Sequence, residues 1–273
     1  MAQTILITGA SSGIGKVTAK LFQEKGWNVV ATMRTPANED ELTQMENVLV
    51  ARLDVTDEDS IATAVDEGID KFGRIDVLLN NAGYGAYGPL EAFPMDRIRR
   101  QFDTNVLGLL ATTKAVLPHL RANGSGTIVN ISSIGGQMTF PLGALYHGTK
   151  FAVEGISEAM HFELEAAGIK TKIVEPGMIA TDFGGRSFDF TNDESMAEYQ
   201  PVIKALFESW GANTQASEPS VVADVIWQAV TDGTDTLRYR AGADAEELLT
   251  SRKAFDDAAF IGGLKSQLGL DKI

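Results

Sequence analysis

The sequence predicts a single α/β domain, in which a doubly wound parallel sheet of about seven strands carries helices on both faces. Short apolar runs alternate along the chain with longer amphipathic ones. The short runs are apolar on both faces, which is typical of parallel strands covered by helices on both sides. The 273 residues contain no linker or repeat. Because α/β folds of ~250 residues often form one unit, we expect one domain over residues 1–273.

Each element follows from its own pattern. Strands are expected at residues 4–8, 28–33, 48–53, 75–79, 127–131 and 170–174, with a last edge strand at 237–240. Helices are expected at 13–25, 57–72, 97–120 and 145–167, the second of them capped by Asp57. Residues 178–213 break the alternation and are expected to form a mobile substrate-binding lid. Residues 243–273 form a C-terminal extension that the minimal fold does not need.

The composition excludes several classes of protein. A formal net charge of −14 disfavours binding to nucleic acids and to anionic membranes, which are themselves negative. The absence of cysteine excludes disulfides, thiolate zinc sites and thiol nucleophiles. The three histidines are too far apart for a ligand motif, so no metal is expected, and His147 and His161 are interpreted as ordinary helix residues. No apolar run reaches the ~20 residues of a membrane helix and no basic leader precedes the first strand, so we expect a cytoplasmic protein.

A glycine-rich loop follows the first strand and opens the first helix, with the spacing G-x-x-x-G-x-G. Glycine permits a tight turn and a close approach of the backbone to a ligand. The helix N-terminus offers free N–H groups to a pyrophosphate. The loop therefore predicts a dinucleotide site, and the alternative is a turn without a ligand. The predicted contacts are Gly9, Ser11, Ser12, Gly13, Ile14 and Gly15.

The end of the second strand indicates which dinucleotide is bound. Proteins that select NAD usually have a carboxylate there, whereas this chain has Arg34 and no carboxylate before Glu39. An arginine can pair with a 2′-phosphate, an interaction of ~1.5–3 kcal/mol. NADP(H) is therefore the expected cofactor and NAD(H) the alternative, unless Arg34 is a solvated surface residue. Asp54 and Val55, after the third strand, are expected to hold the adenine, although Asp54 can also be a simple turn residue.

Tyr146 and Lys150 are four residues apart on one predicted helix, so they share a face. A nearby ammonium and an oxidised nicotinamide would lower the pKa of the phenol from ~10, which suits a general acid in reduction and a general base in oxidation. The pair alone also arises by chance. Its context favours catalysis, because Ser132 and Ser133 end the fifth strand at the edge where ligands bind in open α/β sheets. One of these serines can hold a carbonyl oxygen, and strand alternation leaves open which one.

Two further groups of residues point to the same edge. Asn81, Ala82 and Gly83 end the fourth strand, where small residues let the backbone lie against a cofactor; a plain turn is the alternative. Asn105 lies inside a predicted helix, where asparagine is unfavourable unless its side chain finds a partner. We expect it to hold a water that links Lys150 to solvent, or else to lie on the surface.

From Thr4 to about Thr181 the chain closely resembles the short-chain dehydrogenase/reductase family. T-G-x-x-x-G-x-G, N-N-A-G, the helix asparagine, Ser–Tyr-x-x-x-Lys and Pro-Gly occur in the family's order. The resemblance implies a Rossmann-type fold and selects Ser133 as the substrate-orienting serine, with Ser132 structural. It also implies that Lys150 binds the nicotinamide ribose and that Asn105 completes a proton relay. The nicotinamide contacts that it implies are Pro176, Gly177, Ile179 and Thr181.

The resemblance implies NADP(H)-dependent reduction of a ketone or aldehyde. Some NADP-binding members carry a basic residue where this chain has Ser12, so the NADP preference rests mainly on Arg34. The sequence looks most like the steroid- and ketone-reducing branch, which implies a medium-sized apolar carbonyl substrate and a homodimer or homotetramer. A non-catalytic NADP(H)-binding regulator on the same fold is the alternative. The predicted pocket residues are 84–87, 137–142, Phe183, Phe188, Phe190, Phe207 and Trp210.

Overall fold

A seven-stranded parallel sheet forms the centre of the molecule. The computed structural model describes residues 2–181, 187–212 and 216–272. The strands lie in the order β3-β2-β1-β4-β6-β7-β9, and every neighbouring pair is parallel. They are β1 (Thr4–Ile7), β2 (Asn28–Met33), β3 (Val48–Arg52), β4 (Val77–Asn80), β6 (Gly126–Ile131), β7 (Ile169–Pro176) and β9 (Arg238–Ala241). The predicted fold class is confirmed.

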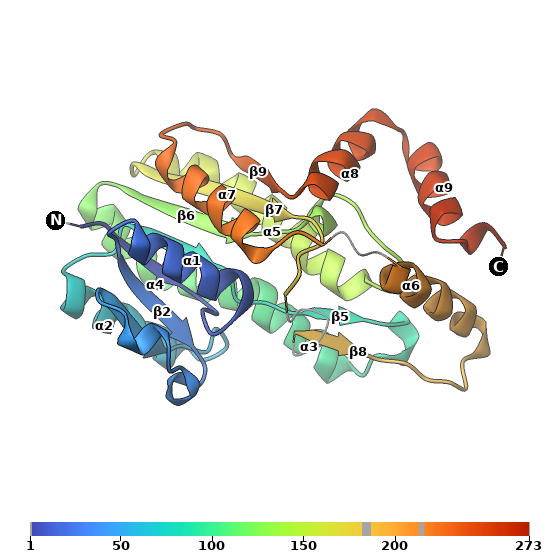
Figure 1. Cartoon of the computed structure of the whole chain (residues 1–273), viewed down its shortest axis with the longest axis horizontal. Coiled ribbons are helices and arrows are strands. Elements are labelled where there is room, and N and C mark those ends of the chain that lie inside the picture. The colour runs from blue at the N-terminus through green and yellow to red at the C-terminus, as the bar shows by residue number, and fades with distance from the viewer. Residues whose placement is uncertain (1, 182–186, 213–215, 273) are drawn as a thin grey trace.

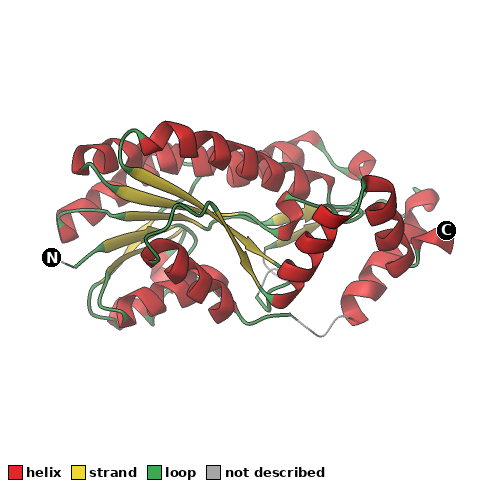
Figure 2. Ribbon diagram, turned by 90° about the horizontal axis from the view of Figure 1, so that it is seen from above, coloured by secondary structure: helices red, strands yellow, loops and turns green. Residues whose placement is uncertain are grey.

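Helices cover both faces of the sheet, as Figures 1 and 2 show. Successive strand residues point to opposite faces. Ile5 and Ile7 therefore belong to a core with α1 and α7, whereas Leu6 belongs to a core with α2 and α4. The helices that build the two layers are α1 (Gly13–Glu24), α2 (Glu58–Phe72), α4 (Gly108–Asn123), α5 (Ala144–Glu165) and α7 (Pro219–Thr231). The predicted cap of α2 is confirmed, because Asp57 accepts from the Ser60 N–H.

The order of the strands defines a crevice. From β1 the chain runs outward to β2 and β3, then crosses to β4 on the other side of β1. In open α/β sheets, ligands bind at the carboxyl ends of the strands where the order reverses in this way. The glycine loop follows β1 and Asn81 follows β4, so both reach this crevice.

The helix predicted at 97–120 is interrupted. It consists of α3 (Met95–Phe102), a π-helical turn (Asp103–Leu107) and α4. A π-helical turn contains one residue more than an α-helical turn and is frequent at functional sites. Asn105 is buried within this turn. The extra residue in the turn changes the direction in which the Asn105 side chain points, compared with a regular α-helix.

The predicted lid contains regular structure. Strand β8 (Phe188–Phe190) pairs in parallel with β5 (Gly85–Tyr87), and helix α6 (Gln200–Ala212) follows. Figure 1 shows this small second sheet beyond the carboxyl edge of the main one. Phe183, predicted to line the pocket, lies outside the described residues, and the mobility of the lid stays a prediction.

The C-terminal extension packs beside the site. Helices α8 (Ala243–Ala254) and α9 (Asp257–Gln267) contribute Leu249 and Phe260 to a cluster with Ile134 and Met138, which lie in the loop after β6. The extension therefore supports the loop that follows Ser133.

Across the described ranges, no helix combines the length and the apolar character needed to cross a membrane.

Candidate active site

Two loops are joined at the crevice between β1 and β4. Thr8 Oγ1 accepts hydrogen bonds from the N–H groups of Asn81 and Ala82, both at 3.0 Å. Asn81 Nδ2 donates to the carbonyl oxygens of Thr8 at 2.9 Å and Gly9 at 3.0 Å. A Cβ at Gly15 would lie 2.4 Å from the Gly9 oxygen, so only glycine fits there. The glycine loop and the loop after β4 thus form one rigid unit.

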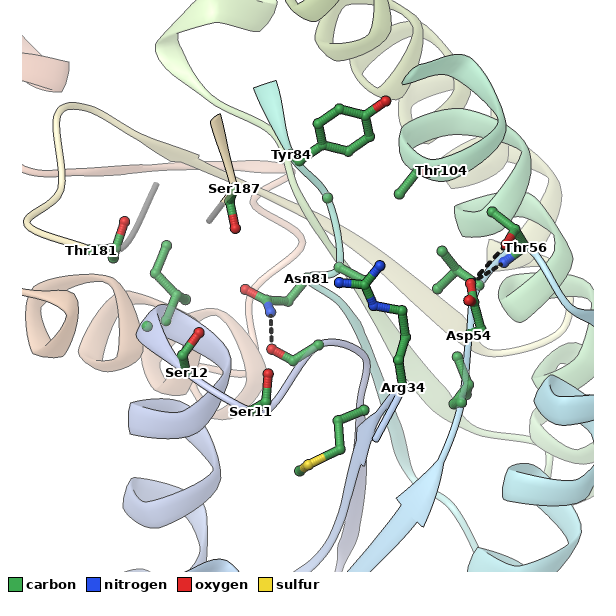
Figure 3. Close-up of a pocket in the computed structure, with 18 of the residues that line it drawn as sticks. Ser11, Ser12, Arg34, Asp54, Thr56, Asn81, Tyr84, Thr104, Thr181 and Ser187 are labelled. Carbon is green, nitrogen blue, oxygen red and sulfur yellow. Dashed lines mark hydrogen bonds between the residues drawn. The ribbon is translucent and has the colours of Figure 1, made fainter. Parts of the chain in front are cut away.

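A cavity of about 630 Å³ opens over this unit (Figure 3). Small-molecule and cofactor sites usually have volumes of ~300–1,000 Å³. The N-terminus of α1 opens onto the cavity, as a pyrophosphate site requires. The bare glycine backbone and this helix end fit a dinucleotide. The predicted cofactor residues that line the cavity are Gly9, Ser11, Ser12, Gly13, Ile14, Arg34, Asp54, Val55, Asn81, Ala82, Gly83 and Thr181.

The other predicted cofactor residues lie beyond its walls: Gly15, Lys150, Pro176, Gly177 and Ile179. Gly15 is buried behind the Gly9 carbonyl. Pro176 lies beside Ser133, since their oxygens are 3.5 Å apart. The cavity therefore includes most of the residues predicted to contact the adenosine and the phosphates, together with Thr181, which was predicted to contact the nicotinamide.

Arg34 and Asp54 face each other across part of the cavity. Figure 3 shows Arg34 extending from the end of β2 into the space between Asn81 and Asp54. This is the position from which a guanidinium can meet a ribose phosphate. Asp54 Oδ1 accepts from the N–H of Thr56 at 3.0 Å and from its hydroxyl at 2.8 Å. Asp54 is therefore a turn residue as well as a wall of the cavity.

The sequence reasoning missed other walls of the cavity. These are Met33, Leu53, Thr56, Arg100, Thr104, Ser187 and Asp189, while Tyr84 and Phe188 were assigned to the substrate pocket instead. Arg100 and Thr104 are four residues apart in a helical stretch, a spacing that would have placed them on one face. The Arg100 guanidinium lies 5.5 Å from the centroid of the Tyr84 ring. The cavity therefore has a second cation besides Arg34.

Ser133, Tyr146 and Lys150 converge at the carboxyl edge of the sheet, and all three are buried. Ser133 follows β6, and the other two lie in the first turns of α5. Tyr146 and Ser133 share a side-chain hydrogen bond. Lys150 Nζ donates to the Ile131 carbonyl at 2.8 Å and lies 5.8 Å from the centroid of the Tyr146 ring. The structure thus brings together the three residues predicted to be catalytic.

Burial controls the protonation of these groups. It raises the pKa of the Tyr146 phenol, and the hydrogen bond with Ser133 opposes the rise. It also lowers the pKa of Lys150 to about 8, although the Glu154 carboxylate opposes this shift. The pKa of Tyr146 is therefore not lowered in the protein alone, because desolvation of the phenolate dominates. Tyr146 is protonated at neutral pH, which is the form that a general acid needs.

Asn105 joins the cofactor edge to the catalytic helix. Its Nδ2 donates to the Tyr84 carbonyl at 2.9 Å and to Thr149 Oγ1 at 3.1 Å, and its Oδ1 accepts from the Tyr84 N–H at 3.1 Å. Thr149 Oγ1 in turn donates to the Tyr146 carbonyl at 2.7 Å. Asn105 therefore holds the backbone at Tyr84 and the first turns of α5 in position. Its role in a proton relay stays a prediction.

A buried charge cluster lies behind Lys150. Arg238 Nε is 2.9 Å from a Glu154 oxygen and 3.6 Å from a Glu175 oxygen. Burial, together with the nearby Glu154, raises the pKa of Glu175 to about 7. Gln137, from the loop after Ser133, donates to Glu175. Within this cluster, the negative charge of Glu154 partly offsets the lowering of the Lys150 pKa by burial.

The Pro-Gly loop after β7 is held by the C-terminal extension. The Met178 N–H donates to Asp244 Oδ2 at 2.6 Å, and the Gly177 N–H donates to the Ala241 carbonyl at 3.0 Å. Asp244 lies in the first turn of α8. The predicted nicotinamide loop is thus fixed by a residue distant in sequence.

Aromatic side chains cover Tyr146. The Tyr87 ring centroid is 5.6 Å from that of Tyr146, 5.4 Å from that of Phe188 and 5.3 Å from that of Trp210. Phe188 and Trp210 were predicted to belong to the pocket, and here they form an apolar wall with Tyr87, which itself packs on Tyr146.

An ion pair fixes this wall to the body. Arg97 of α3 pairs with Asp189 of β8 and also donates to Thr191 Oγ1, just after that strand. These contacts hold β8 in place beside β5.

His147, interpreted from the sequence as an ordinary helix residue, lies in α5 and is buried beside Tyr146. It is 3% exposed, and its Nε2 accepts from the Phe140 N–H at 2.9 Å. Its Nδ1 lies 3.0 Å from the Gly135 carbonyl oxygen. Because Nε2 is an acceptor, the proton must be on Nδ1 and the ring is neutral. Its place next to Tyr146 was the only available signal.

The fold and the site define a class of α/β protein that combines a dinucleotide-sized cavity with a buried Ser–Tyr–Lys set. Residues 3–192 match the short chain dehydrogenase family model. An uncharacterized oxidoreductase of Schizosaccharomyces pombe is 46% identical over 239 residues, covering 87% of this chain and 100% of its own. Retinol dehydrogenase 8 of Bos taurus is 32% identical over 275 residues, with coverages of 93% and 86%.

Solved structures agree with these relatives. A short-chain dehydrogenase from Streptomyces avermitilis superposes with a TM-score of 0.82 at 32% identity, covering 100% of this chain and 98% of its own. ElxO with NADP bound superposes with a TM-score of 0.72 at 30% identity, with coverages of 88% and 98%. The chain belongs to the short-chain dehydrogenase family and is an oxidoreductase.

Proposed function

We propose that the protein is an NADP(H)-dependent carbonyl reductase, which interconverts a ketone or aldehyde and an alcohol by reversible hydride transfer. The observation that carries this proposal is the convergence of buried Ser133, Tyr146 and Lys150 beside a cavity lined by the glycine loop and Arg34. A non-catalytic regulator would not require a phenol, a hydroxyl and an ammonium to meet in a desolvated pocket.

The cofactor assignment rests on charge. Arg34 is exposed at the cavity, with no carboxylate at the end of β2 to repel a 2′-phosphate. Arg100 adds a second cation at the same cavity. ElxO, a structural relative, has NADP bound. NADPH supplies the hydride when bound. NAD(H) is the alternative, and Pro176, Gly177, Ile179 and Thr181 would contact the nicotinamide of either.

The protein's own groups complete the reaction at the substrate oxygen. Ser133 Oγ donates a hydrogen bond to that oxygen as negative charge develops on it. Tyr146 transfers its phenolic proton to the same oxygen, so the carbonyl becomes an alcohol. The Lys150 ammonium stabilises the phenolate left behind, and Asn105 holds the helix in register. In the oxidative direction each proton movement is reversed.

The substrate is a medium-sized apolar carbonyl compound. Tyr87 packs on Tyr146, and Phe188 and Trp210 pack on Tyr87. Aromatic walls of this kind favour apolar, flat ligands. Retinol dehydrogenase 8, similar along most of its length, is named for an apolar alcohol.

We also propose a homodimer or homotetramer. The exposed Phe102, Leu107, Phe151 and Phe162 lie on the stretch from α3 to α5, where apolar surface is available for a second copy. The cytoplasm stays the expected compartment.

The test follows NADPH and NADH consumption with a panel of ketones and aldehydes, comparing wild type with Tyr146→Phe. The loss of a general acid costs ~10²–10⁴ in rate. Tyr239→Phe is the matched control, because it removes a tyrosine hydroxyl that donates to Asp232, outside the proposed site. Equal use of NADH would contradict the cofactor assignment. NADPH binding without turnover of any carbonyl or alcohol would favour a regulator.

A further inference from the structure

The imidazole of His147 bridges the two ends of the loop that follows Ser133. Its Nε2 accepts from the Phe140 N–H at 2.9 Å, and its Nδ1–H donates to the Gly135 carbonyl at 3.0 Å. Both contacts are to backbone, and the ring is 3% exposed. The neutral tautomer with its proton on Nδ1 satisfies both contacts. In the other tautomer, Nε2–H would face the Phe140 N–H donor, and the bare Nδ1 would face the Gly135 carbonyl acceptor.

The surrounding chain is shaped to the ring. A Cβ at Gly135 would lie 2.6 Å from Nδ1, and a Cβ at Gly143 would lie 2.5 Å from Cδ2. Real Cβ atoms do not approach so closely, so both positions must be glycine for the imidazole to fit. This fit restricts the position of the ring, and the two hydrogen bonds select its tautomer.

The contact continues to the catalytic serine. The Gly135 N–H donates to Ser133 Oγ at 3.0 Å. With that donor in place, the Ser133 oxygen accepts one hydrogen bond, and in this structure its own proton is directed to the Pro176 carbonyl oxygen at 3.5 Å. A shift of Gly135 would therefore change the direction in which Ser133 donates.

We propose that His147 is a positioning residue that holds Ser133 in its reactive orientation through Gly135, and that it does so only as the neutral Nδ1–H tautomer. The inference rests on the proposed function, since it assigns Ser133 to the substrate oxygen. It adds a pH-sensitive support to the catalytic serine.

Protonation of His147 would break this support. A charged imidazole carries N–H groups on both nitrogens, so Nε2–H would face the Phe140 N–H. The titratable side chains packed against the ring are Tyr87 and Tyr146, with centroids at 6.0 and 5.6 Å. Burial raises the pKa of both phenols, so neither supplies a negative charge. Burial also lowers the pKa of His147, which keeps it neutral at neutral pH.

The kinetic test uses His147→Leu, which removes both hydrogen bonds, and His147→Gln, whose amide supplies one donor and one acceptor. His161→Gln on the same helix is the control. We expect His147→Leu to lower kcat about tenfold, the equivalent of one buried hydrogen bond, with the KM for NADPH nearly unchanged. Wild-type kcat should fall only as the pH decreases below the ordinary imidazole pKa of ~6.5, and His147→Gln should lack this acid limb.

Action through Ser133 is tested by a double-mutant cycle. In a Ser133→Ala background, His147→Leu should cause no further loss of kcat, because the residue that it positions is gone. Additive losses, an unchanged kcat in His147→Leu, or an acid limb retained in His147→Gln would each overturn the proposal.

A measurement on the wild-type protein does not depend on turnover or on the folding of a variant. The ¹⁵N shifts of the imidazoles, assigned through their connections to the backbone resonances, should show His147 protonated on Nδ1 alone down to a pH below its ordinary pKa of ~6.5. An Nε2–H tautomer or a charged ring at neutral pH would contradict the inference. If no carbonyl or alcohol were turned over, the proposed function would fail while this measurement still decided the tautomer.

Discussion

The carboxylate of Asp244 fills the space into which a side chain at Gly177 would project. A Cβ at Gly177 would lie 2.2 Å from Asp244 Oδ1, and the adjacent Met178 N–H donates to the other oxygen of the same carboxylate. The contact joins the first turn of α8 to the loop after β7. The C-terminal extension is therefore part of the framework of the site.

Gly177→Ala should destabilise the protein by about 1–3 kcal/mol, because the added methyl group overpacks against a carboxylate. Asp244→Ala in the same chain should recover part of that loss. Urea unfolding of the wild type, the two single variants and the double variant gives the coupling energy. Strictly additive changes would show that the two positions do not compete for one space.

Arg34→Ala should raise the KM for NADPH about 10- to 100-fold and leave the KM for NADH almost unchanged, because only NADPH carries the 2′-phosphate. Arg52→Ala is the matched control, since Arg52 ends the neighbouring strand and pairs with Asp57. Initial rates with both cofactors test this. An equal rise for NADPH and NADH would mean that Arg34 binds something other than the phosphate.

Lys150→Met should be inactive but more stable at neutral pH, by about 1–3 kcal/mol, since it removes a buried ammonium. Burial lowers the pKa of Lys150 to about 8 from its usual 10.5. Between these two values the folded state binds fewer protons than the unfolded state, so wild-type stability should rise with pH.

Denaturant unfolding of the cofactor-free proteins at about pH 7 and about pH 10 measures this difference. The stability gap between Lys150→Met and wild type should narrow at the higher pH. A gap that is the same at both pH values would show that Lys150 is not desolvated.

Arg97→Ala and Asp189→Asn should each raise the substrate KM about two- to tenfold, because either change frees β8 from α3. The double variant should be no worse than the single ones. Arg99→Ala, at an exposed position on the same helix, is the control. Steady-state kinetics with the best substrate would reveal the effect, and unchanged values would mean that the ion pair does not hold the wall.

The main strands and the shared helix face of Tyr146 and Lys150 could be predicted because their signals are local. A run such as β1 is apolar on both faces, and Tyr146 and Lys150 are spaced by one helical turn. The π-helical turn at Asn105 could not be predicted. One additional residue in a single turn changes the spacing of apolar residues too little to be seen in the sequence. The pairing of Gly85 with Phe188 also gave no signal, since it joins segments far apart in the sequence.

The roles of His147 and Asp244 were hidden for a related reason. Both side chains bind backbone groups, which every residue carries, so no partner residue type marks the contact. The structure was needed to show which peptide groups they meet. Burial raises the pKa of Tyr146 in the protein without cofactor, and the sequence does not show how completely the phenol is desolvated. The expected lowering, which includes the charge of an oxidised nicotinamide, stays a prediction.

Strand β8 borders both the dinucleotide-sized cavity and the aromatic wall around Tyr87. Ser187, Phe188 and Asp189 line the dinucleotide-sized cavity, while the Phe188 ring also packs on Tyr87 above Tyr146. A movement of this strand that admits the dinucleotide to the cavity would therefore also displace the aromatic wall beside the proposed substrate position. We therefore expect binding of the dinucleotide to change the affinity for the substrate, and binding of the substrate to change the affinity for the dinucleotide.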